Sequence, residues 1–378
     1  MSKTIIIIGA GLAGLSAALQ AAENGCNVKL VSSLPSERAQ SVMAEGGINA
    51  ALNTKDENDS PEEHFTDTIK AACGLADPNA VWGMTQAAPE LVHWLLKLGV
   101  KFNMSGYDDV DLRNFGGQKK KRTAFAQSDT GKQIMTAMID AVRRKEASGM
   151  VERFSHHSFL TLRLCGNICC GCVIRDEYSQ ETVELPGDAV IVATGGMHGL
   201  FGNTTGSLSN TGEVTAELFR LGVPLANSEM IQYHPTTVKC GGKRMLISEA
   251  ARGEGGRLFA MKDGKQWYFM EEKYPELGNL MPRDITAREI WKVSHESEVF
   301  LDMTEISEEI ISNKLSGLAD DCMTYLHKDI RKEPVSVLPG IHYFMGGILV
   351  DEQHRTPIQN LYAAGECCAQ YHGANRLG

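Results

Sequence analysis

The sequence predicts an α/β protein in which a parallel sheet at the start of the chain is interrupted by a second, α+β region. Three observations indicate this class. The β-branched run Thr4–Ile8 leads directly into the turn Gly9-Ala10-Gly11-Leu12-Ala13-Gly14, and an Ala- and Leu-rich helix follows. From about residue 231 the chain gains Trp, Tyr, Glu and Lys. Short apolar runs near residue 350 and beyond then predict a return to the first sheet.

The first 31 residues predict a β-α-β unit with a nucleotide-binding turn. Thr4–Ile8 is expected to be a buried parallel strand, Leu15–Asn24 a helix that Gly25 ends, and Val28–Val31 the next strand. Glycines at the spacing GxGxxG permit a tight turn and close approach of the backbone, and the N-terminus of the helix then faces a pyrophosphate. Because the turn lies between a strand and a helix, it predicts a dinucleotide site.

The residues after the second strand help to distinguish between dinucleotides. An NAD site, and many FAD sites, have an acidic residue at this strand end to bind the ribose. Here Val31 is followed by Ser32 and Ser33. The NAD interpretation is therefore weakened, and FAD stays open.

Composition argues against several classes of protein. The 378 residues are enough for two domains, and the formal net charge of -10 argues against a nucleic-acid partner. The run Lys119–Arg122 is expected to be a solvated loop. The chain has no apolar run of about 18 residues and starts without a signal peptide, so we expect a cytoplasmic protein that does not span a membrane.

The ten cysteines are scattered, which is typical of reduced thiols. Cys165, Cys169, Cys170 and Cys172 form a group close in sequence. They lie in an alternating strand–turn–strand stretch, which favours a structural role over a metal site.

Further elements are predicted in order along the chain. Helices are expected at Pro61–Cys73, Pro78–Leu98, Lys132–Arg144 and Thr211–Leu221. Period-two alternation predicts a small antiparallel sheet over Val151–Leu185, before a buried strand at Asp188–Ala193. Gly347–Val350 and Asn360–Glu366 are expected to be strands that return to the first sheet. The predicted domains are therefore 1–230, an inserted region 231–341, and a return segment 342–378.

A set of polar residues lies in glycine-rich, non-helical surroundings in the second half of the chain. Glu249 and Arg252 are three residues apart, so one helical turn brings them together. Two histidines and two or three arginines that converge predict recognition of a small dianion, because the arginine fork matches a carboxylate. Each residue alone is more often structural. The set consists of His234, Ser248, Glu249, Arg252, Arg283, His342 and Arg376.

A series of short motifs runs through essentially the whole chain. They are Gly9–Gly14, Ala44-Glu45-Gly46-Gly47, Asn114-Phe115-Gly116-Gly117 with Arg122-Thr123, Ala193-Thr194-Gly195-Gly196, Gln232-Tyr233-His234-Pro235-Thr236, Glu249–Gly256, Pro282-Arg283-Asp284, His342–Gly347 and His372–Gly378. With these motifs the chain resembles the flavoprotein subunits of fumarate reductase and succinate dehydrogenase, and more distantly L-aspartate oxidase. The Asn-Phe-Gly-Gly and His-Tyr-x-Met-Gly-Gly forms are similar to the fumarate/succinate branch.

The resemblance implies an FAD-binding, Rossmann-like domain of the glutathione-reductase type and an inserted capping domain that closes over the flavin. It implies hydride exchange between FAD and fumarate or succinate. By matching position, Arg283 resembles the acid/base that delivers a proton to the substrate carbon, and Glu249 and Arg252 resemble its relay. The residues that resemble the carboxylate clamp are His234, Ser248, His342 and Arg376. The expected FAD contacts are Gly9, Ala10, Gly11, Leu12, Ala13, Gly14, Ser32, Ser33, Gln40, Ser41, Ala44, Glu45, Gly46, Gly47, Ala193, Thr194, Gly195, Glu213 and Glu366.

The resemblance also implies partners. An iron–sulfur electron-transfer subunit and a membrane anchor would hold the protein peripherally on the cytoplasmic face of the membrane, and a fused haem domain or a soluble donor would fit as well. No nucleic-acid partner is expected.

Three departures from the family pattern matter. Gln40 stands where membrane-bound relatives carry the histidine that bonds covalently to FAD, so we expect noncovalent FAD and a bias toward fumarate reduction. Ser248-Glu249 replaces the usual Thr-Glu and keeps the hydroxyl. The sequence stops at Gly378, inside the last motif, so we expect the 378 residues to be a fragment.

Two alternatives stay open at this point. L-aspartate oxidase is the alternative within the same class, and turnover of L-aspartate without turnover of fumarate or succinate would favour it. A noncatalytic flavin-binding module is the alternative from another class, and it predicts bound FAD without a dicarboxylate reaction.

Overall fold

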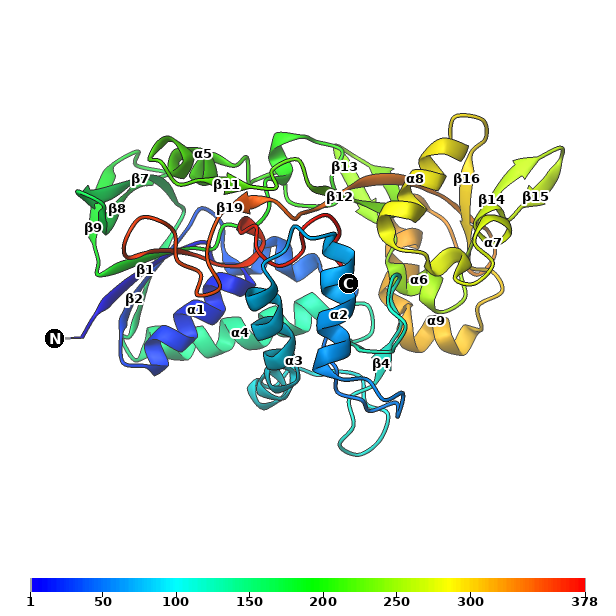
Figure 1. Cartoon of the computed structure of the whole chain (residues 1–378), viewed down its shortest axis with the longest axis horizontal. Coiled ribbons are helices and arrows are strands. Elements are labelled where there is room, and N and C mark those ends of the chain that lie inside the picture. Colours follow the sequence, from blue (N-terminus) through cyan, green and yellow to red (C-terminus); the bar gives the residue numbers. More distant parts are fainter. Residues whose placement is uncertain (1, 378) are drawn as a thin grey trace.

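The computed structural model describes residues 2–377, so Met1 and Gly378, the outer ends of the first and last predicted domains, lie outside the described residues. A parallel sheet with its covering layers occupies one end of the molecule, and the α+β region inserted after β11 (Leu225–Ala226) occupies the other (Figure 1). The predicted α/β class is confirmed.

Five parallel strands form the main sheet, in the order β20-β10-β1-β2-β6. Its centre is β1, where Ile6 and Ile7 are fully buried because both faces of the sheet are covered. In this strand order the direction of winding reverses beside β1, and ligands bind at the carboxyl ends of the strands next to such a point. The strands are β1 (Thr4–Ile8), β2 (Asn27–Ser32), β6 (Val151–Ser155), β10 (Ala189–Val192) and β20 (Leu361–Ala363).

Different layers cover the two faces of this sheet. On one face, α1 (Leu12–Glu23) and α4 (Thr130–Ala147) pack with the strands into one hydrophobic cluster. On the other face lies an antiparallel sheet of β7 (His157–Cys165), β8 (Ile168–Asp176) and β9 (Thr182–Pro186), together with α5 (Glu213–Arg220).

The predicted extent of the antiparallel sheet was wrong at its start. Val151–Ser155 is β6 and pairs in parallel with β2 in the main sheet. Alternation alone cannot tell a half-buried edge strand of a parallel sheet from a strand of a hairpin, because both show a period of two. Similarly, Gly347–Ile348 (β19) pairs with β11 outside the main sheet, and only β20 returns to it.

Two helices match the predicted bounds closely because their ends carry clear signals. α2 (Pro61–Ala72) and α3 (Pro78–Leu98) both begin with proline at the first helical position. The Asp77 carboxylate accepts from the Asn79 N–H at 2.8 Å at the start of α3, and Gly99, with φ 101°, ends it. α1 begins earlier than predicted, at Leu12, so the last three residues of the glycine turn are helical.

The inserted region has its own sheets and its own core. Neither of its sheets shares a strand with the main sheet within residues 2–377. A three-stranded sheet has the order β13-β12-β18 and a four-stranded sheet the order β15-β14-β16-β17. The predicted end of this region at residue 341 falls inside β18. The strands are β12 (Ile231–Cys240), β13 (Lys243–Leu246), β14 (Arg257–Lys262), β15 (Lys265–Trp267), β16 (Val299–Asp302), β17 (Val335–Ser336) and β18 (Leu338–Phe344).

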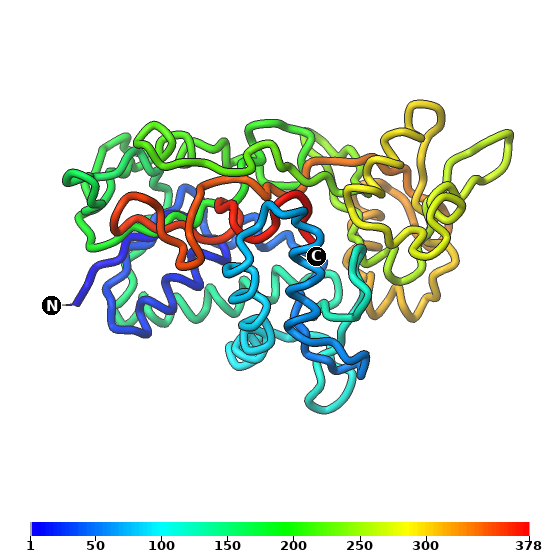
Figure 2. Tube along the Cα trace, viewed as in Figure 1, coloured from blue at the N-terminus to red at the C-terminus, as the bar shows by residue number. Residues whose placement is uncertain are grey.

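The helices of the inserted region are short, and they pack with its strands around one hydrophobic cluster. They are α6 (Glu249–Gly253), α7 (Phe269–Lys273), α8 (Arg283–Val293), α9 (Glu308–Lys314) and α10 (Ser316–Asp321). Figure 2 shows the chain after β18 running back from this region toward the main sheet and ending near α2. This return brings residues 372–377 alongside elements that are far away in sequence.

Minor elements complete the fold. The short strands β3 (Ile48–Asn49), β5 (Thr123–Ala124) and β4 (Leu112–Arg113) form a small sheet. Among the described residues, no helix has the combination of length and apolar character that is needed to cross a membrane.

The basic run Lys119–Arg122 is only partly the solvated loop that was predicted. Lys119 and Lys121 are exposed, but Arg122 is fully buried. Its guanidinium donates to the Asp59 carboxylate at 2.7 Å and lies 3.0 Å from Asp67. No local pattern could indicate this pairing, because both acids lie more than fifty residues away in the chain.

Two helical glycines provide a test of the packing between α1 and the main sheet. A Cβ at Gly14 would lie 1.9 Å from the Gly9 carbonyl oxygen, whereas a Cβ at Gly83 in α3 would have no neighbour within 4 Å. Replacing Gly14 by Ala should lower the free energy of unfolding by about 1–3 kcal/mol or more, because the backbone must move apart. Gly83→Ala should raise it by up to about 1 kcal/mol. Urea unfolding measures both, and equal stability of the two variants would contradict the packing.

Candidate active site

One continuous cavity of about 910 Å³ joins the two predicted sites. Its lining includes the turn Gly9–Ala13 and the loop Ala193–Gly196 from the main sheet. It also includes His234, Glu249 and Arg283 from the inserted region. Cofactor sites are concave and of this order of size. The glycine turn and the polar cluster are therefore parts of one site.

The glycine turn lies where the ends of β1 and β10 meet. Gly9 has φ +113°, and a Cβ there would lie 2.2 Å from the Ala193 carbonyl oxygen. Gly14 does not line the cavity, and its lack of a side chain lets α1 pack directly on Gly9. The absence of a Cβ at Gly9 thus lets the ends of β1 and β10 meet, and the backbone of Gly9 and Gly11 lines the cavity as a cradle that fits a flat dinucleotide.

Apart from Gly14, every predicted FAD contact lines this cavity. They are Gly9, Ala10, Gly11, Leu12, Ala13, Ser32, Ser33, Gln40, Ser41, Ala44, Glu45, Gly46, Gly47, Ala193, Thr194, Gly195, Glu213 and Glu366.

The loop Ala44–Gly47 is held from behind by a buried arginine. Arg113 donates to the carbonyl oxygens of Glu45 (3.1 Å) and Gly46, and its guanidinium lies 4.3 Å from the centre of the Phe125 ring. Burial, reinforced by Asp321, raises the pKa of Glu45 to about 8. Glu45 is therefore mostly protonated at neutral pH and adds little negative charge to the cavity.

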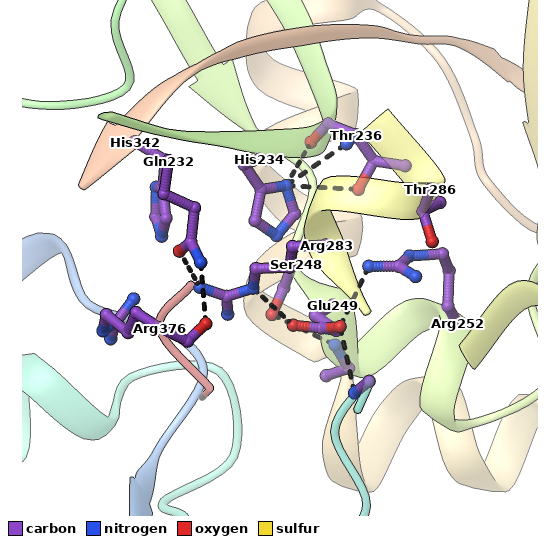
Figure 3. A network of polar contacts seen from close by, with 12 residues as sticks. Gln232, His234, Thr236, Ser248, Glu249, Arg252, Arg283, Thr286, His342 and Arg376 are labelled. Atoms are coloured by element: carbon purple, nitrogen blue, oxygen red, sulfur yellow. Dashed lines mark hydrogen bonds and ion pairs between the residues drawn. The ribbon is translucent and has the colours of Figure 1, made fainter. Parts of the chain in front are cut away.

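The Glu249 carboxylate is the centre of the polar cluster (Figure 3). Its Oε2 accepts from Arg283 Nε at 2.8 Å, and its Oε1 accepts from Arg252 Nη2 at 3.1 Å and from the Gly116 N–H at 3.0 Å. The carboxylate is buried, which by itself would raise its pKa, but Arg283 and Arg252 hold that pKa below the usual value. Glu249 is therefore ionised and fully hydrogen-bonded.

Arg283, at the start of α8, joins this carboxylate to the cavity. Its Nε donates to Glu249 and its Nη1 donates to Gln232 Oε1 at 2.8 Å. Within residues 2–377, no hydrogen-bond partner is found for its Nη2, and the residue lines the cavity. One nitrogen of this guanidinium is thus left to donate to a bound molecule. Arg252 does not line the cavity and lies behind Glu249.

Two histidines from neighbouring strands face one another across the cluster. The ring centres of His234 on β12 and His342 on β18 are 5.0 Å apart. His234 Nδ1 accepts from the Thr236 N–H at 3.2 Å, and His342 Nδ1 lies 2.8 Å from Thr205 Oγ1. Burial lowers the pKa of both rings well below the usual value, and nearby positive groups such as Arg283 add to this. Both histidines are therefore neutral at pH 7.

Arg376 completes the cluster from the return segment. Its guanidinium lies 4.3 Å from the centre of the Tyr343 ring, and its buried Nη1 has no hydrogen-bond partner among the described residues. Together with Arg252 and Arg283 it gives three cations, whereas the nearby carboxylates are Glu249 and Glu366, of which Glu366 acts on Arg376. The excess of positive charge and the unused donors match a small dianion. All seven residues of the predicted polar set therefore lie in one cluster.

Sequence reasoning assigned no role to several residues that the structure brings to the cluster. Gln232 was noted only as part of a motif, although its place two residues before His234 on the same strand could have indicated a shared face. Thr205, which holds His342, lies in an irregular loop and carries no comparable signal. Arg244 on β13 also lines the cavity.

The four cysteines Cys165, Cys169, Cys170 and Cys172 do not gather at one point, although Cys165 Sγ and Cys170 Sγ lie 3.0 Å apart. Cys169 and Cys172 point into the core, whereas Cys165 is exposed on the same hairpin. Among residues 2–377, no group of three or more histidine, cysteine or acidic side chains is placed to hold a metal ion.

Comparison with known proteins identifies the family. The family model described as "FAD binding domain" matches residues 4–378. The succinate dehydrogenase flavoprotein subunit of Bacillus subtilis is 44% identical over 100% of this chain and 66% of its own length. The L-aspartate oxidase of Streptomyces coelicolor is 34% identical over 100% of this chain and 65% of its own length. The chain thus spans about two thirds of the length of these relatives.

Among solved structures, E. coli quinol fumarate reductase FrdA superimposes with a TM-score of 0.91 at 30% identity, over 100% of this chain and 67% of that one. The family model, the relatives in sequence and the similar solved structure all indicate the same family. The chain belongs to the FAD-binding family that contains the flavoprotein subunits of succinate dehydrogenase and fumarate reductase together with L-aspartate oxidase.

Proposed function

We propose that this chain carries the catalytic site of an FAD-dependent enzyme that interconverts fumarate and succinate and acts mainly as a fumarate reductase. The observation that carries this proposal is the bonding of Arg283. Two of its nitrogens are fixed by Glu249 and Gln232, and the third is free at the cavity. An acid held in this way can deliver a proton to one defined place.

The substrate would be held by its two carboxylates. Arg376, with an unpaired buried Nη1, offers a charge-assisted hydrogen bond to one of them. His234 and His342, both neutral, and the Ser248 hydroxyl can donate to the carboxylates without adding charge. Holding the carboxylates polarises the double bond between them, which favours addition of a hydride.

The reaction needs one hydride and one proton for each double bond. Reduced FAD, when bound, would supply the hydride. Arg283 Nη2 delivers the proton to the neighbouring carbon, and a proton passed from Arg252 through Glu249 restores its charge. Both links of this relay are short, at 3.1 and 2.8 Å. Because Arg252 does not line the cavity, replacement protons would reach Arg283 by this route without passing through the substrate site.

The cluster favours a dicarboxylate without an amino group over L-aspartate. An ammonium group needs an acceptor close to the carboxylate clamp. Glu249 already accepts from Arg252, Arg283 and Gly116. Glu366, the carboxylate that acts on Arg376, already accepts from the Phe344 N–H and lies 3.3 Å from His198 Nε2. L-aspartate oxidase therefore remains the second candidate, supported by its similarity in sequence.

Several relatives are named as subunits, and we propose that in this chain, too, the electrons that reduce the flavin arrive from a partner protein. The proposal includes an iron–sulfur subunit and a membrane anchor that place the protein peripherally at the cytoplasmic face. Purification of the chain together with an iron–sulfur protein from its own cells would support the proposed partner subunit. Reduction of the bound flavin by a soluble donor alone, at the full rate of turnover, would show that no such subunit is needed.

FAD should be released by denaturation. Gln40 lines the cavity at the place where the resemblance puts the linking histidine, and an amide cannot form that bond. After precipitation with trichloroacetic acid, the yellow flavin is expected in the supernatant. Flavin fluorescence that stays with the polypeptide band on a denaturing gel would show a covalent bond and contradict this expectation.

The roles of Arg283 and His342 can be separated by kinetics. Arg283→Gln keeps much of the shape but removes the charge and the transferable proton, so kcat for fumarate should fall by about 10²–10⁴-fold. His342→Ala, the matched control in the same cluster, removes a contact that is made before the transition state and should mainly raise KM. Both variants should retain FAD. If Arg283→Gln kept a near-normal kcat with FAD bound, another residue would have to be the acid.

A further inference from the structure

Gln232 is buried between two segments that are far apart in sequence, and both hydrogens of its side-chain NH₂ group are hydrogen-bonded. Its Oε1 accepts from Arg283 Nη1 at 2.8 Å, within the inserted region. Its Nε2 donates to Asn375 Oδ1 at 3.1 Å and to the Arg376 carbonyl oxygen at 2.7 Å, both in the return segment. Gln232 does not line the main cavity. It therefore contacts the proposed acid without contacting the substrate (Figure 3).

The chain of hydrogen bonds continues to the surface. Asn375 Nδ2 donates to Asp284 Oδ1 at 3.0 Å, and Asp284 directly follows Arg283 at the start of α8. Gln232, Asn375 and Asp284 line a second hollow of about 370 Å³, and none of the three lines the main cavity. This chain of hydrogen bonds starts at Arg283 on α8, passes through Gln232 to Asn375 in the return segment, and ends at Asp284 on α8.

The direction of these hydrogen bonds is fixed by their two ends. A guanidinium can only donate, and an ionised carboxylate can only accept. Between Arg283 and Asp284 the two amides therefore have one consistent orientation. Asn375 must turn its NH₂ to Asp284 and its oxygen to Gln232, and Gln232 must turn its oxygen to Arg283. The Arg376 carbonyl oxygen favours the same orientation of Gln232.

We propose that Gln232, Asn375 and Asp284 form a latch between the inserted region and the return segment that positions Arg283 for proton transfer. This inference rests on the proposed function, because it takes Arg283 to be the acid. When the latch is closed, Arg283 is held at Nε by Glu249 and at Nη1 by Gln232, so Nη2 has one direction in which to point. When the two segments separate, Gln232 loses both acceptors of its NH₂ group.

The latch makes the acid depend on contact between the two segments. Arg283 and Gln232 belong to the inserted region, whereas the groups that orient Gln232 belong to Asn375 and Arg376. Arg376 also lines the cavity and is a proposed substrate contact. The same movement that brings Arg376 to the substrate would therefore align Arg283, and the proton would be offered only in the closed site. Misplacement of a reacting group by about 1 Å can cost 10²-fold in rate.

An exchange of the two outermost side chains tests the latch. Asp284→Asn removes the group that only accepts, and Asn375→Asp places two carboxylates against each other. Each single change should lower kcat for fumarate by about 3- to 30-fold through loss of alignment. The double variant Asp284→Asn/Asn375→Asp restores one donor and one acceptor with the oxygen still facing Gln232. Its kcat should return to within about threefold of the unmodified protein.

The measurement is steady-state reduction of fumarate by the FAD-loaded protein with a reduced viologen as electron donor. Arg288→Gln is the control, because Arg288 is the other partner of Asp284, at 3.6 Å and on the surface, and its loss should leave kcat unchanged. KM of the Asp284→Asn variant should also stay within about twofold, since Asp284 does not line the main cavity. If the single changes lowered kcat only by damaging the fold, the loss of kcat would persist in the double variant, or the two losses would add up.

The outcomes separate this inference from the proposed function. If Arg283→Gln lowers kcat but the exchanged pair shows additive losses, the latch is wrong and Arg283 remains the acid. If single changes at Asp284 and Asn375 leave kcat unaltered, the latch is likewise wrong. If Arg283→Gln leaves kcat intact, the proposed function itself fails, whatever the exchanged pair shows.

Discussion

The site depends on one buried carboxylate. Glu249 accepts from Arg252, Arg283 and the Gly116 N–H, and these three groups come from α6, α8 and the Asn-Phe-Gly-Gly loop. Removing one partner of such a buried pair typically costs about 3–5 kcal/mol, because it leaves an uncompensated charge. Without Glu249, the buried guanidinium groups of Arg252 and Arg283 would be left without a counter-charge between them. The carboxylate thus allows the protein to concentrate positive charge where a dianion is to bind.

The opposite end of the cavity depends on the absence of side chains. Gly9 and Gly14 let the ends of β1 and β10 and the start of α1 approach one another to distances that a Cβ would forbid. This leaves backbone groups and a helix N-terminus at the point where the sheet changes its direction of winding. The glycine cradle and the charged cluster share one cavity, so a dinucleotide held by the first would reach toward a substrate held by the second.

Much of this arrangement could be predicted from sequence, because the signals were local. The prolines that begin α2 and α3, the caps Ser60 and Asp77 before them, and the glycine turn after β1 each fix a short stretch by themselves. The polar set was found because its members share unusual, glycine-rich surroundings, and the resemblance to a family gave each of them a role. The predicted roles and the predicted domain boundaries remain predictions.

What could not be predicted depends on contacts between distant segments. The period of two in Val151–Ser155 does not say which sheet the strand joins, and β6 joins the main sheet. The burial of Arg122 depends on Asp59 and Asp67, which a local pattern cannot reveal. Gln232 became recognisable as more than a motif residue only when the return segment placed Asn375 beside it.

The most direct test of the account uses the visible spectrum of the protein with bound FAD. The flavin is reduced with dithionite in the absence of oxygen, excess reductant is removed, and fumarate is added. The account predicts that the spectrum of oxidised FAD returns with fumarate and does not return with L-aspartate or malonate in its place. If the flavin stays reduced in the presence of fumarate, the charged cluster does not carry out the proposed reaction in this chain.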